Sequence, residues 1–406
     1  MKRFLPFLLP VALLLFCIFS SVLIHRSSWF VQDKHFVKLA TSFTKGDLFL
    51  NPINLPDGDF ADYFGKQYLF FGPMPAVILV PFVLLFGAGF PQMFLSLFGL
   101  VVTFVGVFLL CRKFKFDDVD SLWLSIFFVF GTVYFFVGVV NISAYVVQAV
   151  AVPFVILAIL EYFTKRRWFL IGLLTAAAIF TRVTYLGVAV FFVLEILRQR
   201  KNIDIKQALL AFLIPILVCV FLLGVYNFRR FHSPFDTGYT RNVSVLNKPE
   251  GNWQKGFFSP AHIPGNLYSL FVMAPEVVRI GELEFVLKFP YVRASGWGMS
   301  IFLTSPLFVY LLLSKGKEYT RSALISIFAL ALPSMIYFGI GSAQYGYRYA
   351  LDFIPLLFLI LLSAFAKGVP TFAKWLIFVG VLFNLLYCMS IWNSWPVFDF
   401  LAKLWG

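Results

Sequence analysis

Apolar residues run along the chain in long blocks that short polar stretches separate. The segments 93–110 and 326–340 contain no charged residue at all. A helix of about 20 apolar residues is long enough to cross the hydrocarbon core of a bilayer. The pattern therefore predicts an all-α polytopic membrane protein, with residues 1–406 forming a single integral membrane domain.

One apolar block, 74–89, is too short for a full span, at roughly fifteen residues, and it contains Pro75 and Pro81. This length suits an interfacial or re-entrant helix. The remaining blocks predict about eleven transmembrane helices. They lie near residues 4–24, 91–111, 121–140, 143–163, 168–181, 184–198, 206–226, 299–314, 321–341, 349–366 and 371–391.

The overall composition agrees with this pattern, because 61% of the residues are apolar and only 13% are charged. The net charge of +14 is not spread as in a nucleic-acid groove. Basic residues form short clusters between apolar blocks, which is typical of cytoplasmic loops. These clusters are Lys2 and Arg3, Arg112 to Lys115, Lys165 to Arg167, Arg198 to Lys206, Lys315 to Arg321, and Lys367 with Lys374.

Placing the clusters inside the cell sets the topology. The N-terminus is then cytoplasmic, helix 4–24 is an uncleaved first span, and the C-terminal tail 393–406 is extracytoplasmic. Two large extracytoplasmic loops follow, at 25–90 and 227–298, and the second holds another candidate interfacial helix near 264–275. If block 74–89 spanned the membrane, the next three basic clusters would change sides, so the interfacial interpretation is favoured.

Acidic residues gather in the first of these loops, directly after the first span. Asp33 lies close to the membrane surface with His35 beside it, and a carboxylate there can accept a proton from a hydroxyl nucleophile. Further along the loop the acids also permit a divalent-cation site with oxygen ligands, and no other cofactor is indicated. These acids are Asp47, Asp57, Asp59 and Asp62.

Arginines on the outer side run against the positive-inside trend. Arg182 and Arg348 lie in short outer turns, and Arg229 with Arg230 follows the span 206–226. Such residues can be interfacial anchors whose side chains reach lipid phosphates. They can also form a binding site for an anionic lipid headgroup or a phosphorylated substrate, because the guanidinium fork matches phosphate oxygens. The sequence alone leaves both interpretations open.

No phosphate-binding loop, dinucleotide fingerprint, serine-nucleophile elbow or zinc helix motif occurs in the sequence. Chemistry that starts from an already activated, lipid-linked donor is therefore favoured over chemistry driven by a nucleotide. A transporter or flippase of lipid-linked sugars is the first alternative, but ionisable residues are nearly absent from the middle of the helices. A non-catalytic membrane scaffold subunit is the second alternative.

Several motifs resemble the GT-C fold glycosyltransferase superfamily, which includes the protein O-mannosyltransferases and the lipid A aminoarabinose transferases. The motifs are Asp33-Lys34-His35-Phe36, Phe71-Gly72-Pro73-Met74-Pro75, Tyr226-Asn227-Phe228-Arg229-Arg230, Ser295-Gly296-Trp297-Gly298 and Gly346-Tyr347-Arg348-Tyr349. They follow one another over nearly the whole chain. The resemblance implies a GT-C-like bundle with juxtamembrane helices in two large outer loops, and a polyprenyl-phosphate-linked sugar as donor.

The resemblance also implies roles for individual residues. Asp33 matches the first catalytic aspartate, the base for the acceptor hydroxyl, and Arg348 with Arg229 or Arg230 would hold the lipid phosphate. Further candidates for substrate contacts are His35, Asp62, Lys66, Arg182, Tyr345 and Tyr349.

The chain departs from the superfamily at two acidic positions. Lys34 stands where a glutamate often follows the first aspartate, and the outer turn at Asn141 to Tyr145 lacks a second acid. These differences weigh against a two-carboxylate or metal mechanism. The resulting prediction is an inverting glycosyltransferase that moves a sugar to an extracytoplasmic acceptor. It would lie in the cytoplasmic membrane if bacterial and in the endoplasmic reticulum if not, with the sugar and the acceptor left open.

Overall fold

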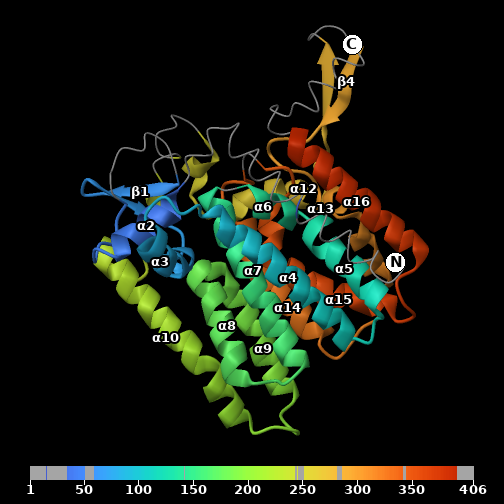
Figure 1. Ribbon diagram of the computed structural model, residues 1–406, viewed down its shortest axis with the longest axis horizontal. Helices are drawn as coiled ribbons and strands as arrows, with labels where there is room; N and C mark the ends of the chain where they lie inside the picture. The colour runs from blue at the N-terminus through green and yellow to red at the C-terminus, as the bar shows by residue number, and fades with distance from the viewer. Residues whose placement is uncertain are drawn as a thin grey trace.

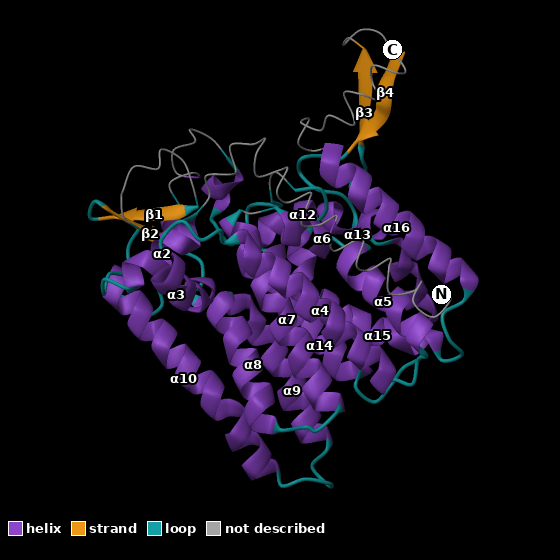
Figure 2. Cartoon of the chain, viewed as in Figure 1, coloured by secondary structure: helices purple, strands orange, loops and turns teal. Residues whose placement is uncertain are grey.

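The computed structural model describes residues 15, 34–50, 59–140, 142–242, 245, 251–280, 286–341 and 344–390. Asp33, Asp57, the tail 393–406 and the predicted first span apart from Leu15 lie outside these residues. Within them, helices form the body of the molecule, and the strands form two hairpins at one edge of it (Figure 2).

Four helices pack in a row from the middle of the bundle to its edge: α4 (Met93–Lys113), α7 (Ser143–Phe163), α8 (Trp168–Thr181) and α10 (Ile205–Phe231). α4 packs on α7, α7 on α8, and α8 on α10 (Figure 1). The other helices are α2 (His35–Phe43), α3 (Met74–Phe86), α5 (Asp118–Phe130), α6 (Tyr134–Val139), α9 (Leu186–Arg198), α12 (Ile263–Phe271), α13 (Ile301–Thr304), α14 (Thr320–Met335), α15 (Ile354–Leu361) and α16 (Thr371–Ser390). Short 3-10 helices are η2 (Val183–Tyr185), η3 (Tyr239–Arg241), η4 (Asn252–Lys255), η5 (Pro260–His262), η6 (Pro306–Leu313), η7 (Arg348–Asp352) and η8 (Leu362–Phe365).

Among the described helices, α4, α7 and α10 are long and apolar enough to cross a membrane individually. Five more apolar stretches of helix are shorter, including α8 and α14. α10 also exposes large apolar side chains, such as Leu217 and Phe221, and such a surface requires a lipid environment. The chain is therefore an integral membrane protein, while the number of spans stays a prediction.

The predicted spans 143–163 and 168–181 coincide with α7 and α8, but the predicted span 121–140 is broken into α5 and α6 near Gly131. Asn384 of α16 donates its side-chain amide to the carbonyl oxygens of Phe130 (2.9 Å) and Thr132 (3.2 Å) at this break. Backbone carbonyls that a helix break releases inside a membrane need such a partner. Asn384 thus stabilises an interruption that the apolar pattern did not reveal.

The predicted span 299–314 is also interrupted. It consists of α13 and η6, which meet at Ser305 and Pro306. Proline has no N–H to donate, and it disfavours helical backbone at the residue before it. Pro306 therefore accounts for the division.

The described residues 34–50 and 59–90, predicted to form the first outer loop and called the first outer segment below, fold as a compact unit beside the C-terminal end of α10 (Figure 1). It contains α2, α3 and an antiparallel hairpin of β1 (Phe60–Tyr63) and β2 (Lys66–Leu69). α3 occupies the block that was predicted as an interfacial helix. Ala61 of β1 forms a β-bridge with Asn242, so the first outer segment is joined to the second.

The second outer segment contains α12, at the position of the predicted helix 264–275. It also contains an antiparallel hairpin of β3 (Glu276–Ile280) and β4 (Val286–Arg293), which projects from the helical body (Figure 1). Neither hairpin was predicted from the sequence.

Gly72 fixes the chain between β2 and α3 against the end of α8. A Cβ atom at this position would lie 2.3 Å from the carbonyl oxygen of Phe180 and 2.4 Å from that of Thr181. Backbone atoms cannot move aside as a side chain can, and overpacking typically costs about 1–3 kcal/mol. We expect Gly72→Ala to lower the free energy of unfolding in detergent by about that amount. Gly89→Ala is the matched control because no atom lies within 4 Å of its Cβ position, and equal stability losses in both variants would contradict the prediction.

Candidate functional site

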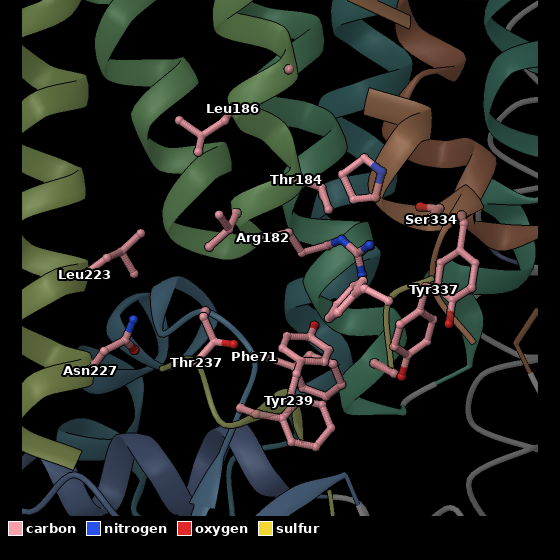
Figure 3. Close-up of a pocket in the computed structure, with 18 of the residues that line it drawn as sticks. Phe71, Arg182, Thr184, Leu186, Leu223, Asn227, Thr237, Tyr239, Ser334 and Tyr337 are labelled. Atoms are coloured by element: carbon pink, nitrogen blue, oxygen red, sulfur yellow. The ribbon is translucent and has the colours of Figure 1, made fainter. Parts of the chain in front are cut away.

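A cavity of about 580 Å³ lies where the two outer segments meet the ends of the bundle helices. The chain after β2 supplies Phe71, the end of α8 supplies Arg182, and the last turns of α10 supply Asn227 and Arg230. The opposite wall includes Tyr337. Figure 3 shows Arg182 between Leu223 and Asn227 of α10 on one side and Ser334 and Tyr337 on the other.

Arg348, the first residue of η7, lines this cavity and is 8% exposed. Its guanidinium donates long hydrogen bonds to Gln148 Oε1 (3.3 Å), to the hydroxyl of Tyr349 (3.4 Å) and to the carbonyl of Ala144 (3.5 Å). Typical N–H···O distances are about 2.7–3.2 Å. The Tyr145 and Tyr349 rings lie 5.0 and 4.6 Å from its central carbon. The guanidinium is therefore held by two aromatic rings and three hydrogen bonds, and these bonds are longer than usual.

Arg230 reaches the cavity from the last turn of α10 and is 3% exposed. It donates to the carbonyl of Leu69 and to Asn227 Oδ1, both at 2.7 Å. The ring of Tyr226 lies 3.9 Å from its central carbon. No carboxylate in the described part of the chain forms an ion pair with Arg230 or Arg348.

Arg182 is different because it has a buried counter-ion. Its Nη2 donates to Asp352 Oδ2 at 3.0 Å, and Thr184 Oγ1 donates to the same oxygen at 2.8 Å. The side chains of Arg182 and Asp352 are 8% and 0% exposed. A buried ion pair of this kind fixes the end of α8 relative to η7, at the floor of the cavity.

Charge in the cavity is thus unbalanced. Three guanidiniums converge on it from α8, α10 and η7, while Asp352 neutralises that of Arg182 and Asp59 adds one negative charge to the lining. The Nε–H groups of all three arginines are buried without a hydrogen-bond partner within the described residues. Buried cations and buried unpaired donors are costly unless a partner satisfies them. An anion with several oxygen atoms, such as a phosphate, would balance the excess positive charge of the cavity.

Aromatic residues form the part of the cavity nearest the outer segments. Tyr239 contacts Phe70, with ring centroids 4.6 Å apart, and Phe71, at 6.2 Å. Burial raises the pKa of Tyr239 to about 12, so its hydroxyl stays protonated at neutral pH and can act as a hydrogen-bond donor. Asp59 also lines the cavity.

Apolar side chains line the opposite part of the cavity, which lies between the helices. Leu186 and Val190 come from α9 and Leu223 from α10. The cavity thus combines a cationic centre with an apolar flank and an aromatic end. This arrangement can bind an amphipathic anion whose apolar part stays in the membrane.

The predicted site residues divide into two groups. Arg182, Arg230, Arg348 and Tyr349 all line the cavity. Five others do not line it: Asp62, Lys66 and Arg229 are exposed, and His35 and Tyr345 are buried elsewhere. Asp33 lies outside the described residues.

Sequence analysis gave no role to several residues of the cavity. Asn227 was named only as part of a motif, Tyr239 and Tyr337 were given no individual role, and Asp59 was considered only as one acid of a possible cation site. No spacing in the sequence distinguishes these residues, because the outer segments bring them in from separate elements. Within the described residues, no three His, Cys, Asp or Glu side chains gather in a way that could hold a metal ion.

The Arg182–Asp352 pair leads to a stability prediction. Removing one partner of a buried ion pair leaves the other charge uncompensated, which typically costs about 3–5 kcal/mol. We expect Asp352→Asn to lower the free energy of unfolding by about 3 kcal/mol or more. The double variant Asp352→Asn/Arg182→Gln should recover part of this loss, because it removes both charges.

Unfolding in detergent micelles measures these differences. Glu276→Gln is a suitable control because the Glu276–Arg293 pair is exposed and should contribute about 0–1 kcal/mol. If the two substitutions lowered the free energy of unfolding additively in the double variant, Arg182 and Asp352 would not be coupled and the prediction would be wrong.

No protein-family model matches the chain. No curated protein matches it either. Solved structures do resemble it. ArnT from Cupriavidus metallidurans bound to undecaprenyl phosphate superposes with a TM-score of 0.51 and 12% identity, over 95% of this chain and 75% of that one. The apo state of the same protein gives a TM-score of 0.47 and 13% identity, over 82% of this chain and 54% of that one.

An oligosaccharyltransferase from Archaeoglobus fulgidus in the apo form gives a TM-score of 0.46 and 12% identity, over 95% of this chain and 55% of that one. The chain thus spans between about half and three quarters of the length of these proteins. The likeness over most of the chain to ArnT bound to undecaprenyl phosphate shows that the chain has the GT-C fold, as its sequence motifs predicted.

Proposed function

We propose that the protein is an inverting glycosyltransferase that moves a sugar from a polyprenyl-phosphate donor to an acceptor on the extracytoplasmic side of the membrane. The observation that carries the proposal is the convergence of Arg182, Arg230 and Arg348 on one cavity with an apolar flank. A lipid phosphate matches both parts of the cavity, because its anionic oxygens suit guanidinium groups and its chain suits apolar side chains.

The fold supports the same proposal. One ArnT structure that this chain resembles in fold holds undecaprenyl phosphate. Transfer of that ligand class to this chain is our inference, and it agrees with the cationic centre found here. We further propose that the cavity faces the extracytoplasmic side, because the basic clusters of the loops belong to the opposite ends of the helices.

In the proposed reaction, the acceptor hydroxyl oxygen attacks the anomeric carbon of the sugar from the side opposite the phosphate. The bond from this carbon to the phosphate oxygen breaks as the new glycosidic bond forms, which inverts the configuration. Asp33 takes the proton of the hydroxyl as general base. Arg348 and Arg230 stabilise the charge that builds on the departing lipid phosphate, as fixed donors do for a developing oxyanion.

Incubation of the purified protein in liposomes with radiolabelled undecaprenyl-phosphate sugars tests the proposal directly. Transfer of label to an acceptor, or release of undecaprenyl phosphate in its presence, supports the enzyme. Movement of the intact donor between leaflets without transfer would instead indicate a flippase. If the protein shows neither transfer nor movement of the donor, even with a complete acceptor extract, the cavity does not have its proposed role. A scaffold function would then be favoured.

A further inference from the structure

Asp59 is a carboxylate in the wall of the cavity. It directly precedes β1, whose Phe60 and Ala61 are buried. Ala61 also forms the bridge to Asn242 of the second outer segment. Two outer segments therefore fix the backbone that carries Asp59, and the residue itself is half-buried.

The position of Asp59 relates it to Arg348. Both charges act electrostatically on Tyr145, Tyr239 and Tyr337, which belong to three separate elements. The hydrogen bonds of the Arg348 guanidinium to Ala144, Gln148 and Tyr349 are long, at 3.3–3.5 Å. Asp59 and Arg348 therefore bring opposite charges into the same space, and a ligand with an anionic end and a hydroxyl-bearing end would meet both.

Aromatic rings surround this space. Phe70 and Tyr239 form one wall, with centroids 4.6 Å apart, and Tyr337 and Tyr349 form another, at 6.2 Å. A sugar ring places its C–H face on an aromatic ring, while its hydroxyl groups need acceptors such as a carboxylate. Phe70, Tyr239 and Asp59 together supply both kinds of contact, whereas the apolar flank beyond Leu223 supplies neither.

We infer that Asp59 accepts hydrogen bonds from the hydroxyl groups of the transferred sugar while Arg348 holds its phosphate. The inference rests on the proposed glycosyltransferase function and adds the end of the cavity that recognises the carbohydrate. It makes Asp59 a specificity-determining residue. The lipid chain then lies toward α9 and α10, and the sugar lies toward the outer segments.

The carboxylate has opposite effects on two ligands, which makes the inference testable. Undecaprenyl phosphate alone gains nothing from Asp59, because both are negatively charged. Undecaprenyl phosphate that carries a sugar gains hydrogen bonds to a charged acceptor. We expect Asp59→Asn to weaken binding of the sugar-bearing lipid about 10- to 100-fold, and to leave the affinity for undecaprenyl phosphate unchanged or raise it.

Binding of both probes to the detergent-solubilised protein can be measured by intrinsic tryptophan fluorescence. The panel comprises undecaprenyl phosphate alone and the same lipid carrying mannose, glucose or 4-amino-arabinose. Asp62→Asn is the matched control, because Asp62 lies in β1, close to Asp59 in the sequence, but is exposed and outside the cavity. Asp59→Glu keeps the carboxylate and should retain part of the discrimination between the probes.

Three results would overturn the inference: an equal loss for both probes in Asp59→Asn, no loss for either, or a wild-type protein that binds every sugar-bearing lipid no more tightly than the bare lipid. Failure of the wild-type protein to bind undecaprenyl phosphate at all would instead reject the proposed function itself. Thermal unfolding of each variant identifies any loss of binding that comes from misfolding. If Asp59→Asn misfolds, the comparison of the two probes is made with Asp59→Glu instead.

Discussion

Asp33→Asn is expected to fold and insert normally but to lower the turnover number for sugar transfer about 100- to 10,000-fold. The asparagine side chain has nearly the same size as aspartate but cannot take up the proton that the acceptor hydroxyl loses. Steady-state kinetics with a labelled undecaprenyl-phosphate sugar measures the effect. Because the proton is transferred only during the reaction, the affinity for the donor should change little.

Two variants make this prediction specific. Asp62→Asn removes an exposed acid of the same outer loop and should keep full activity. Asp59→Asn, by contrast, is expected to weaken donor binding, so the two effects separate in kcat and KM. Wild-type turnover in Asp33→Asn would remove this residue from the mechanism, even if the protein proves to be a glycosyltransferase.

Sequence reasoning predicted the bundle well where physical constraints are local. Block length fixes a membrane helix, so the bounds of α7 and α8 follow from hydrophobicity alone. Arginines at the outer ends of helices were conspicuous because they oppose the charge bias of membrane loops. For this reason Arg182 and Arg348 were proposed before any geometry was known, and both line the cavity.

Long-range pairings were beyond the sequence. Asp352 is 170 positions from Arg182, and no spacing rule connects a helix end with an acid so far along the chain. The break near Gly131 depends in the same way on Asn384, which comes from the last described helix. Tertiary packing determines which residue pairs with a buried charge or with the free carbonyls of a broken helix. That packing cannot be read from a single sequence.

The choice between neighbouring residues was equally inaccessible. Adjacent residues on a helix point about 100° apart, so only one of Arg229 and Arg230 can face a given space. The structure buries Arg230 in the cavity wall and leaves Arg229 exposed. Asp59 and Asp62 differ in the same manner at β1. Without knowledge of which face is covered, residue type alone gave Arg229 and Arg230 equal weight, and the sequence favoured Asp62 over Asp59 as a substrate contact.

The difference between Arg229 and Arg230 provides the control for the second large effect, which concerns Arg348. Arg348→Gln should lower kcat/KM for transfer about 100- to 1,000-fold, the range typical for loss of a fixed donor to a developing oxyanion. Glutamine keeps a hydrogen-bond donor but removes the positive charge. Arg348→Lys should be intermediate, because it restores the charge without the planar fork that contacts two oxygens at once.

Arg230→Gln should have a smaller effect than Arg348→Gln, because Leu69 and Asn227 already occupy two of the Arg230 donors at 2.7 Å. Arg229→Gln should be silent. Binding of undecaprenyl phosphate and the unfolding temperature together distinguish loss of the phosphate site from damage to the fold. Arg348→Gln should weaken binding of undecaprenyl phosphate at an unchanged unfolding temperature, whereas a variant with damaged packing would also have a lower unfolding temperature. If Arg229→Gln reduced transfer as much as Arg348→Gln, general attraction of the surface for anionic lipid would explain both results. A phosphate site in the cavity predicts the opposite result. Substitution of the arginines in the cavity wall should then lower transfer activity, whereas loss of a positive charge at the membrane surface should not.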